Sequence, residues 1–171
     1  MQPAIAIAVI VLVAAAAWLI VRLRSPRPEF APLPTAPDDP LLLAAMERAR
    51  ASRGEFLGRL RQPREHALVK LHFVSNSQQV EHLWAEVLQL ISDAELEVRL
   101  VTPPVTHSGH LDRVYRCQLD DIEDWQVLDA DGTVHGGFTQ RAMFAIARRD
   151  GVTLPPDLLA QERNYRDHPP R

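Results

Sequence analysis

The distribution of apolar residues divides the chain of 171 residues into parts of different character. An unbroken apolar run, residues 3–21, is followed by residues 25–40, which contain six prolines and no hydrophobic period. Farther along, apolar positions recur first at the spacing of a helix and then at every second residue, as in half-buried strands. The pattern predicts four consecutive segments: a transmembrane anchor over residues 1–23, a proline-rich linker over 24–39, a folded domain over 40–155 and a C-terminal tail over 156–171.

The apolar run contains no charged side chain and has the length of a membrane span. At about 1.5 Å per residue, a helix over residues 3–21 would extend about 29 Å, close to the hydrocarbon thickness of about 30 Å. A cleaved signal peptide is the alternative interpretation, but it would require a basic start and a shorter apolar stretch. Because Arg22, Arg24 and Arg27 follow the run and outweigh the single amino-terminal charge, the rest of the chain is predicted to face the cytoplasm.

The linker is predicted to be an extended, semi-rigid stalk, because proline favours the polyproline conformation and the segment contains too few apolar residues to order itself. A proline-rich ligand for a partner domain is the alternative interpretation of this segment. At the other end of the chain, the tail after Pro155 is expected to dock as a short helix and to end loosely.

A helix is predicted to begin at the boundary between linker and domain. Asp39 followed by Pro40 is a typical helix start, because an N-cap oxygen precedes a residue whose missing amide hydrogen costs nothing in the first turn. Apolar residues then recur at helical spacing as far as Pro63. Gly54 and Gly58 weaken the middle of this segment, so we expect a break near them.

After this helix the hydrophobic period changes to two, which predicts strands over HALVKLHFV (66–74), VEHLWAEVLQLI (80–91), LEVRLV (96–101) and VYRCQL (114–119). Asp131-Gly132 predicts a hairpin turn, and Gly136 and Gly137 permit a sharp change of direction before Thr139, which is expected to cap the helix QRAMFAIARRD. The predicted fold class is α+β. A single N-terminal transmembrane helix precedes a small domain, in which an N-terminal and a C-terminal helix pack a strongly bent antiparallel meander sheet of four or five strands.

Charge is distributed unevenly along the domain. Residues 40–65 hold six arginines against three glutamates, whereas residues 66–160 hold seven Lys and Arg against fourteen Asp and Glu. Six of the acids fall within twelve residues, namely Asp120, Asp121, Glu123, Asp124, Asp129 and Asp131. Such a cluster is typical of a surface for a basic partner, although a solvated, turn-rich edge would have the same composition. It also argues against nucleic acid, which requires a basic face.

Two tryptophans of the domain are also candidates for binding. Trp84 lies in a predicted strand, and Trp125 lies beside the acids. Tryptophan is enriched at binding hot spots, but in a domain of this size it more often anchors the core through its large apolar ring. Asp124 is most simply a turn or capping acceptor. If the acidic cluster is a binding surface, the candidate binding residues are Asp120, Asp121, Glu123, Asp124, Trp125 and Trp84.

Enzymatic chemistry has weaker support in the sequence. His107, His110 and Asp112 in THSGHLD could meet a zinc ion, and a metal-dependent hydrolase that uses this loop is the alternative function. Cys117 is expected to be a small buried hydrophobic residue rather than a nucleophile. Asp131 and Gly132 do not belong to a calcium loop of the EF-hand type, because both terminal carboxylates are missing. No phosphate loop, dinucleotide motif or nucleophile elbow is present, and we expect no cofactor.

Four short motifs occur in order along the domain. They are MERARASRGEF; Glu81, Leu83, Trp84 and Glu86; Ile122, Asp124 and Trp125; and Gly136, Gly137, Phe138 and Thr139. With these motifs in this order, the chain resembles the bacterial family of domain of unknown function 2314 (DUF2314). The resemblance covers about residues 46–147. The resemblance implies a small α+β domain in a bacterial protein and implies no activity.

The sequence thus favours a single-pass protein of the bacterial inner membrane, inserted in the lipid bilayer through residues 3–21. Its domain is predicted to act as a non-enzymatic interaction module that uses an acidic sheet edge to engage a basic protein partner.

Overall fold

The computed structural model describes residues 36–74, 78–104 and 113–166. The predicted anchor, residues 24–35 of the predicted linker and the loop with His107, His110 and Asp112 lie outside these residues. Within the described ranges, none of the helices combines the length and the apolarity that crossing a bilayer requires.

One six-stranded sheet with strand order β4-β3-β2-β1-β5-β6 forms the centre of the domain, and every neighbouring pair is antiparallel. Its strands are β1 (His66–Val74), β2 (Val80–Leu90), β3 (Glu95–Leu100), β4 (Val114–Gln118), β5 (Asp124–Leu128) and β6 (Val134–Gly136). The α+β class and the antiparallel sheet are confirmed, but the prediction of a simple meander of four or five strands is corrected. Only β1 to β4 form a meander, because β5 crosses over to pair with the other side of β1.

The core lies on one face of this sheet. Val69 of β1 stands opposite Ala85 of β2 on one side and Trp125 of β5 on the other, and none of the three side chains is exposed to solvent. Residues at alternate positions of β3 continue the same apolar layer, with Leu96 and Val98 fully buried. The alternation read from the sequence therefore assigns the buried face correctly.

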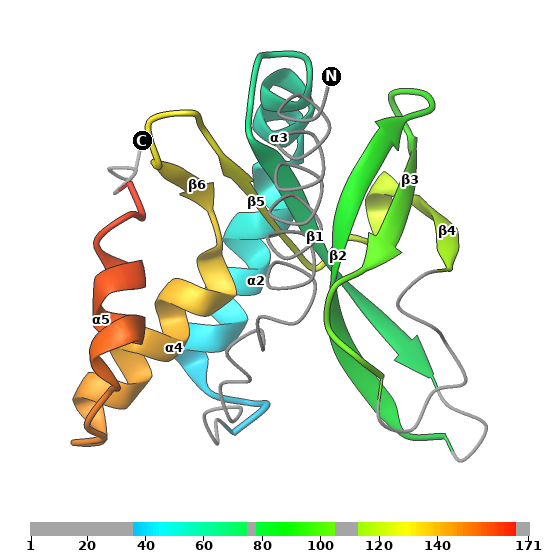
Figure 1. The fold of residues 1–171 in the computed structure, drawn as a ribbon. Coiled ribbons are helices and arrows are strands. Elements are labelled where there is room, and N and C mark those ends of the chain that lie inside the picture. The colour runs from blue at the N-terminus through cyan, green and yellow to red at the C-terminus, as the bar shows by residue number, and fades with distance from the viewer. Residues whose placement is uncertain (1–35, 75–77, 105–112, 167–171) are drawn as a thin grey trace, which may run out of the picture. The chain divides into compact units, whose positions relative to one another are not determined.

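Helices α2 (Pro40–Ala51) and α3 (Arg53–Leu60) pack on β5, and α2 also lies against α4 (Phe138–Arg149). Figure 1 shows α2, α4 and α5 (Pro156–Glu162) gathered at the β5–β6 end of the sheet, with β3 and β4 at the opposite end. The first helix breaks at Ser52, ahead of the break predicted near Gly54 and Gly58. At this break, the Ser52 hydroxyl accepts a hydrogen bond from the indole of Trp125 at 3.0 Å and donates one to the carbonyl of Ala49.

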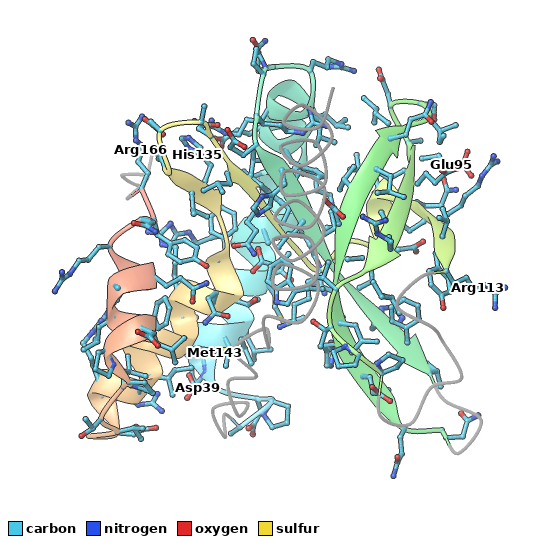
Figure 2. All side chains as sticks on the ribbon, viewed as in Figure 1. Asp39, Glu95, Arg113, His135, Met143 and Arg166 are labelled. Atoms are coloured by element: carbon cyan, nitrogen blue, oxygen red, sulfur yellow. The ribbon has the colours of Figure 1, made fainter. Side chains whose placement is uncertain are left out.

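The start of α2 is confirmed at Asp39, whose carboxylate accepts a hydrogen bond from the amide of Leu41 at 2.9 Å. The same carboxylate forms an ion pair of 2.7 Å with Arg149 at the end of α4. Figure 2 labels Asp39 in the view of Figure 1. The hydrogen bond from Arg149 holds the pKa of Asp39 below its ordinary value, against the opposite effect of burial. One residue thus caps α2 and fixes the C-terminal end of α4 beside it.

The turn between β5 and β6 also follows the sequence prediction. Gly132 has a φ of 84°, its amide donates to the carbonyl of Asp129, and the Asp131 carboxylate accepts from the amide of Thr133 at 2.9 Å. Beyond α4, the predicted docking of the tail is observed in α5 and in Tyr165. The Tyr165 hydroxyl donates to the side-chain oxygen of Gln126 at 3.1 Å, so residues of the tail join the same globular unit.

Candidate functional site

The segment that connects β4 to β5 contains most of the predicted binding residues. It begins with a short 3-10 turn (Leu119–Asp121), in which the Asp121 carboxylate accepts a hydrogen bond from the amide of Gln118 at 3.0 Å. Arg53, at the start of α3, donates to the carbonyls of Asp120 and Ile122 at 2.6 and 2.7 Å. It also forms an ion pair of 3.2 Å with the Asp120 carboxylate. Because both peptide carbonyls are fixed by one guanidinium, this acidic segment has a defined conformation.

The Asp124 carboxylate is fully buried and has the structural role of a helix cap. One oxygen accepts hydrogen bonds from the amides of Trp125 and Phe138, at 2.8 and 3.1 Å. The other accepts from the amide and the hydroxyl of Thr139, at 2.7 and 2.6 Å. The carboxylate therefore satisfies amides of the first turn of α4, where the helix dipole also favours negative charge.

This geometry corrects the prediction that Thr139 caps the helix that follows β6, which is α4. The residue at the N-cap position is Gly137, which has a φ of 61°, and Thr139 lies inside the first turn of α4. The cap oxygen is supplied from β5, and the interpretation of Asp124 as a capping acceptor is confirmed. Sequence reasoning favoured Thr139 because a local cap can be recognised from adjacent residues, whereas a cap from another strand cannot.

Lys70 lies beside this buried carboxylate, opposite Asp124 in the pairing of β1 with β5. Its ammonium group is 3.4 Å from the Thr139 hydroxyl. Burial lowers the pKa of Lys70, although the nearby charges of Asp124 and Glu123 oppose this shift. Burial also raises the pKa of Asp124, against the hydrogen bonds from Thr139, Trp125 and Phe138. Both shifts have the same physical cause, which is the cost of placing charge where little water reaches.

Glu123 and two histidines form the more accessible part of the site. The Glu123 carboxylate lies 2.6 Å from Nδ1 of His82 and 3.6 Å from Nδ1 of His72, which is the cross-strand neighbour of His82. The glutamate side chain is 13% exposed, whereas each imidazole is about half exposed. Burial raises the pKa of Glu123, but the hydrogen bond with His82 and the charges of His82, His72 and Lys70 outweigh it and leave the pKa below its ordinary value.

Together, Asp120, Asp121, Glu123, His72 and His82 form a surface that we call the acid-histidine patch. Asp121 and His72 line one hollow of about 310 Å³ between β1 and β4, and Glu123 bridges the two imidazoles. The Asp120 side chain is 93% exposed and Asp121 is exposed as well. Trp84 is half-buried and lies two residues from His82 on the same face of β2, directly opposite Lys70. The patch thus combines fixed negative charge with two half-exposed imidazole rings, and the half-buried Trp84 lies at its border.

Two of the predicted binding residues are corrected by their burial. Asp124 and Trp125 are 0% exposed and cannot contact a partner. The Trp125 ring stacks on Phe56 with 5.3 Å between ring centroids and meets Phe138 edge-on at 5.7 Å. The expected sheet edge is also wrong for these two residues, because β5 lies between β1 and β6. Trp125 is therefore a core anchor, which was the alternative that the sequence left open.

Lys70, His72 and His82 are the site residues that sequence reasoning did not select. Their positions on the polar side of predicted strands were readable from the alternation of HALVKLHFV and from the pattern of the next strand. Their link to Glu123 was not readable, because it depends on β5 pairing with β1 rather than with β4. The register His72 to His82, which brings the two imidazoles together, becomes visible only in the sheet.

The structure bears on metal clusters and on the reactivity of Cys117 within the residues that it describes. Within these residues, no three His, Cys, Asp or Glu side chains are arranged to hold a metal ion. The zinc loop predicted at His107, His110 and Asp112 lies outside them. Cys117 is buried, as predicted, and burial raises the pKa of its thiol to about 12, which disfavours the thiolate that a nucleophile requires.

The acid limb of the stability curve should depend on Glu123. Because its pKa is depressed in the folded chain, the stability that its carboxylate contributes is present above the unfolded pKa of about 4.3 and is lost as the pH falls through the folded value. Glu123→Gln is expected to unfold about 1 kcal/mol more easily at pH 7 and to show a shallower loss of stability below about pH 4.3. Urea unfolding from pH 7 to pH 3 measures both effects. Glu47→Gln, at an exposed carboxylate of α2, is the control, and identical acid limbs for wild type and Glu123→Gln would contradict the assignment.

Comparison with known proteins gives one match. A family model described as "Uncharacterized protein conserved in bacteria (DUF2314)" matches residues 39–150, which contain the whole segment of the predicted resemblance. No curated protein and no solved structure matches the chain. The match covers α2 to α4, and therefore the acid-histidine patch and the buried Asp124 cap.

Proposed function

The chain belongs to the DUF2314 family of uncharacterised bacterial proteins, and we propose that it is a membrane-anchored interaction module that binds a protein partner without catalysing a reaction. The proposed anchor is the apolar run of residues 3–21 in the bacterial inner membrane, and the three arginines that follow it support a cytoplasmic position for the domain. The contact surface is the acid-histidine patch, with Trp84 at its border.

The observation that carries the proposal is the fixed conformation of exposed negative charge. The Asp120 side chain is 93% exposed, although Arg53 holds the peptide carbonyls on either side of Asp121. An exposed group on an ordered backbone loses little conformational entropy when a partner binds, so more of the contact energy appears as affinity. Complementary charge also accelerates the encounter of the two proteins. These properties suit a surface that recognises a basic segment of another protein.

The four acids among the predicted binding residues differ in how accessible their carboxylates are, and this difference narrows the proposed contact surface. The Asp124 carboxylate is buried and caps α4, and the Glu123 carboxylate contacts the imidazoles of His82 and His72. Asp120 and Asp121 provide the most exposed charge, although Asp120 pairs with Arg53 and Asp121 accepts a hydrogen bond from the amide of Gln118. Trp84 offers part of an indole ring. Tryptophan at the border of a charged patch supplies the apolar contact that exposed ion pairs alone rarely provide.

Charge reversal tests this surface. The double substitution Asp120→Lys and Asp121→Lys is expected to reduce the recovery of bound partners about tenfold, because two attractive contacts become repulsive. The full-length chain is expressed in cells with an affinity tag, cross-linked, and captured from solubilised membranes, and partners are quantified by mass spectrometry. The double substitution Asp120→Asn and Asp121→Asn removes the charge but keeps an oxygen at position 121 to accept from the amide of Gln118. It should give an intermediate loss of partner recovery.

A matched control changes Glu47 and Asp157, exposed carboxylates of α2 and α5 outside the patch, to lysine. This control alters the net charge by the same amount as the double reversal, so a general charge effect would lower both recoveries equally. Partners that are unchanged in the Asp120 and Asp121 variant would contradict the contact surface. Recovery of the tagged chain in the soluble fraction would contradict the anchor, independently of the partner result.

A further inference from the structure

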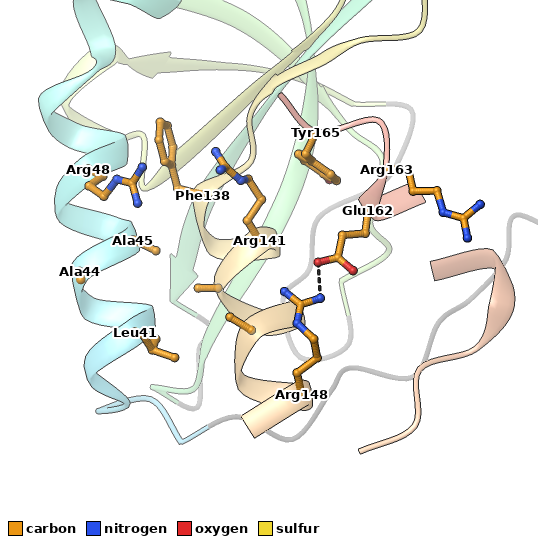
Figure 3. A pocket seen from close by; sticks show the side chains of 12 residues that line it. Leu41, Ala44, Ala45, Arg48, Phe138, Arg141, Arg148, Glu162, Arg163 and Tyr165 are labelled. Carbon is orange, nitrogen blue, oxygen red and sulfur yellow. Dashed lines mark hydrogen bonds and ion pairs between the residues drawn. The ribbon is translucent and has the colours of Figure 1, made fainter. Parts of the chain in front are cut away.

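A cavity separate from the acid-histidine patch lies between α2, α4 and the segment that follows α5. Its volume is about 570 Å³, within the range typical of small-molecule sites. Leu41 and Ala44 of α2 and Ala145 of α4 form part of its apolar wall, and the rings of Phe138 and Tyr165 close one end (Figure 3). The proposed interaction function makes no use of this cavity.

The charged residues of the lining have predominantly one sign. Four arginines and one glutamate line the cavity and give it a net charge of +3, although the whole chain has a net charge of -3. The glutamate is Glu162, and it forms an ion pair with Arg148. The arginines are Arg48, Arg141, Arg148 and Arg163. A concave surface with this excess of cations concentrates anions from solution.

Two of these arginines reach into the hollow from different helices. Figure 3 shows Arg48, from α2, and Arg141, from α4, on either side of Phe138, whereas Arg163 points away from them. The Arg48 guanidinium carbon lies over the Phe138 ring at 5.5 Å from its centroid, so the cation is attracted to an aromatic face. Burial and the charge of Asp124 raise the pKa of Tyr165, and the nearby charge of Arg141 partly opposes this shift. Both cations are therefore placed beside the aromatic end of the cavity.

We propose that this cavity binds a small organic anion, in which a phosphate or carboxylate group meets Arg48 and Arg141 and an apolar body lies against the alanines and Phe138. Guanidinium groups recognise such oxyanions through paired N-H donors in a planar fork. The small side chains of α2 and α4 leave room for the apolar body beside the charged group. An inorganic anion would use the charged part of the site alone and should bind more weakly.

Calorimetric titration of the full-length chain tests the proposal with defined probes. Phenyl phosphate and phenylacetate carry the two oxyanion types on the same ring, inorganic phosphate lacks the ring, and benzyl alcohol lacks the charge. At least one of the two aromatic anions is expected to bind, and to bind at least about tenfold more tightly than inorganic phosphate or benzyl alcohol. The preferred aromatic anion identifies the oxyanion that the site selects.

Substitutions then locate the binding. Arg48→Gln and Arg141→Gln are each expected to weaken the preferred aromatic anion about tenfold, the effect of losing one charged hydrogen bond. Arg50→Gln is the matched control, because Arg50 lies on the same helix, pairs with Glu47 and does not line the cavity. Ala44→Leu is expected to reduce binding of the aromatic anion by occupying part of the apolar wall, with unchanged thermal unfolding.

Several results would overturn the proposal. One is that the chain binds none of the probes, and another is that benzyl alcohol binds as tightly as the aromatic anions. A third is that Arg50→Gln weakens binding of the aromatic anion as much as Arg48→Gln does. Failure of the acid-histidine patch to bind a partner would leave these titrations unaffected, since the two surfaces share no residue.

Discussion

Replacing Asp124 with alanine is expected to lower the free energy of unfolding by about 3–5 kcal/mol, the range for breaking a buried charged network. The substitution removes the acceptor of four hydrogen bonds, from the amides of Trp125, Phe138 and Thr139 and from the Thr139 hydroxyl. Each donor would stay in a site that little water reaches, and an unsatisfied buried donor costs about 1–3 kcal/mol. Lys70 would also lose the charge beside it.

Urea denaturation followed by circular dichroism measures this loss for the purified full-length chain. Asp124→Asn keeps one carbonyl oxygen and should therefore be less destabilising than alanine. Asp120→Ala is the control, because the Asp120 side chain is 93% exposed and its pair with Arg53 should contribute less than about 1 kcal/mol. Equal destabilisation by Asp124→Ala and Asp120→Ala would show that the cap of α4 is not a main element of stability.

Gly136→Ala is expected to destabilise the domain by about 3–5 kcal/mol, from a strained backbone and an overpacked site together. Gly136 ends β6 with a φ of 76°, a conformation that residues with a Cβ rarely adopt. An added Cβ would lie 2.2 Å from the carbonyl oxygen of Trp125 and 2.7 Å from the Cε3 atom of its ring. Neither atom can move easily, because Trp125 of β5 is fully buried and its ring stacks on Phe56 of α3.

Gly132→Ala separates the two contributions. Gly132 has a similar φ of 84°, but an added Cβ would meet nothing within 4 Å. Its substitution should cost about 1–2 kcal/mol, the effect of the backbone conformation alone. Thermal and urea unfolding of the two variants give the comparison. A Gly136→Ala protein as stable as the Gly132→Ala protein would contradict the close packing of β6 on Trp125.

The sequence predicted the local elements of this domain well because local rules govern them. Alternation assigned the strands and their buried face, the Asp39-Pro40 pair marked the start of α2, and Asp131-Gly132 marked the turn between β5 and β6. Each of these features depends on residues within a few positions of each other. The motifs also identified the family, whose match at residues 39–150 confirms the predicted resemblance.

The sequence did not predict how the elements combine, because distant contacts decide it. The first helix breaks at Ser52, whose hydroxyl accepts a hydrogen bond from the indole of Trp125, although the two glycines nearby have the lower helix propensity. Asp124 replaces Thr139 as the cap of α4 because the crossing of β5 to β1 brings the carboxylate to that helix. The same crossing buries two of the residues that were predicted to bind a partner. Acidic composition alone could not separate a structural carboxylate from an exposed one.

The crossing of β5 also constrains the order in which the nascent chain can complete its sheet. Strands β1 to β4 are adjacent in sequence and can form hairpins while translation continues. The second edge of β1 can be paired only after residues 124–128 have left the ribosome. Until then, that edge presents unpaired peptide groups to other chains, a common origin of aggregation. The last third of the polypeptide therefore protects a strand that is synthesised near the start of the domain.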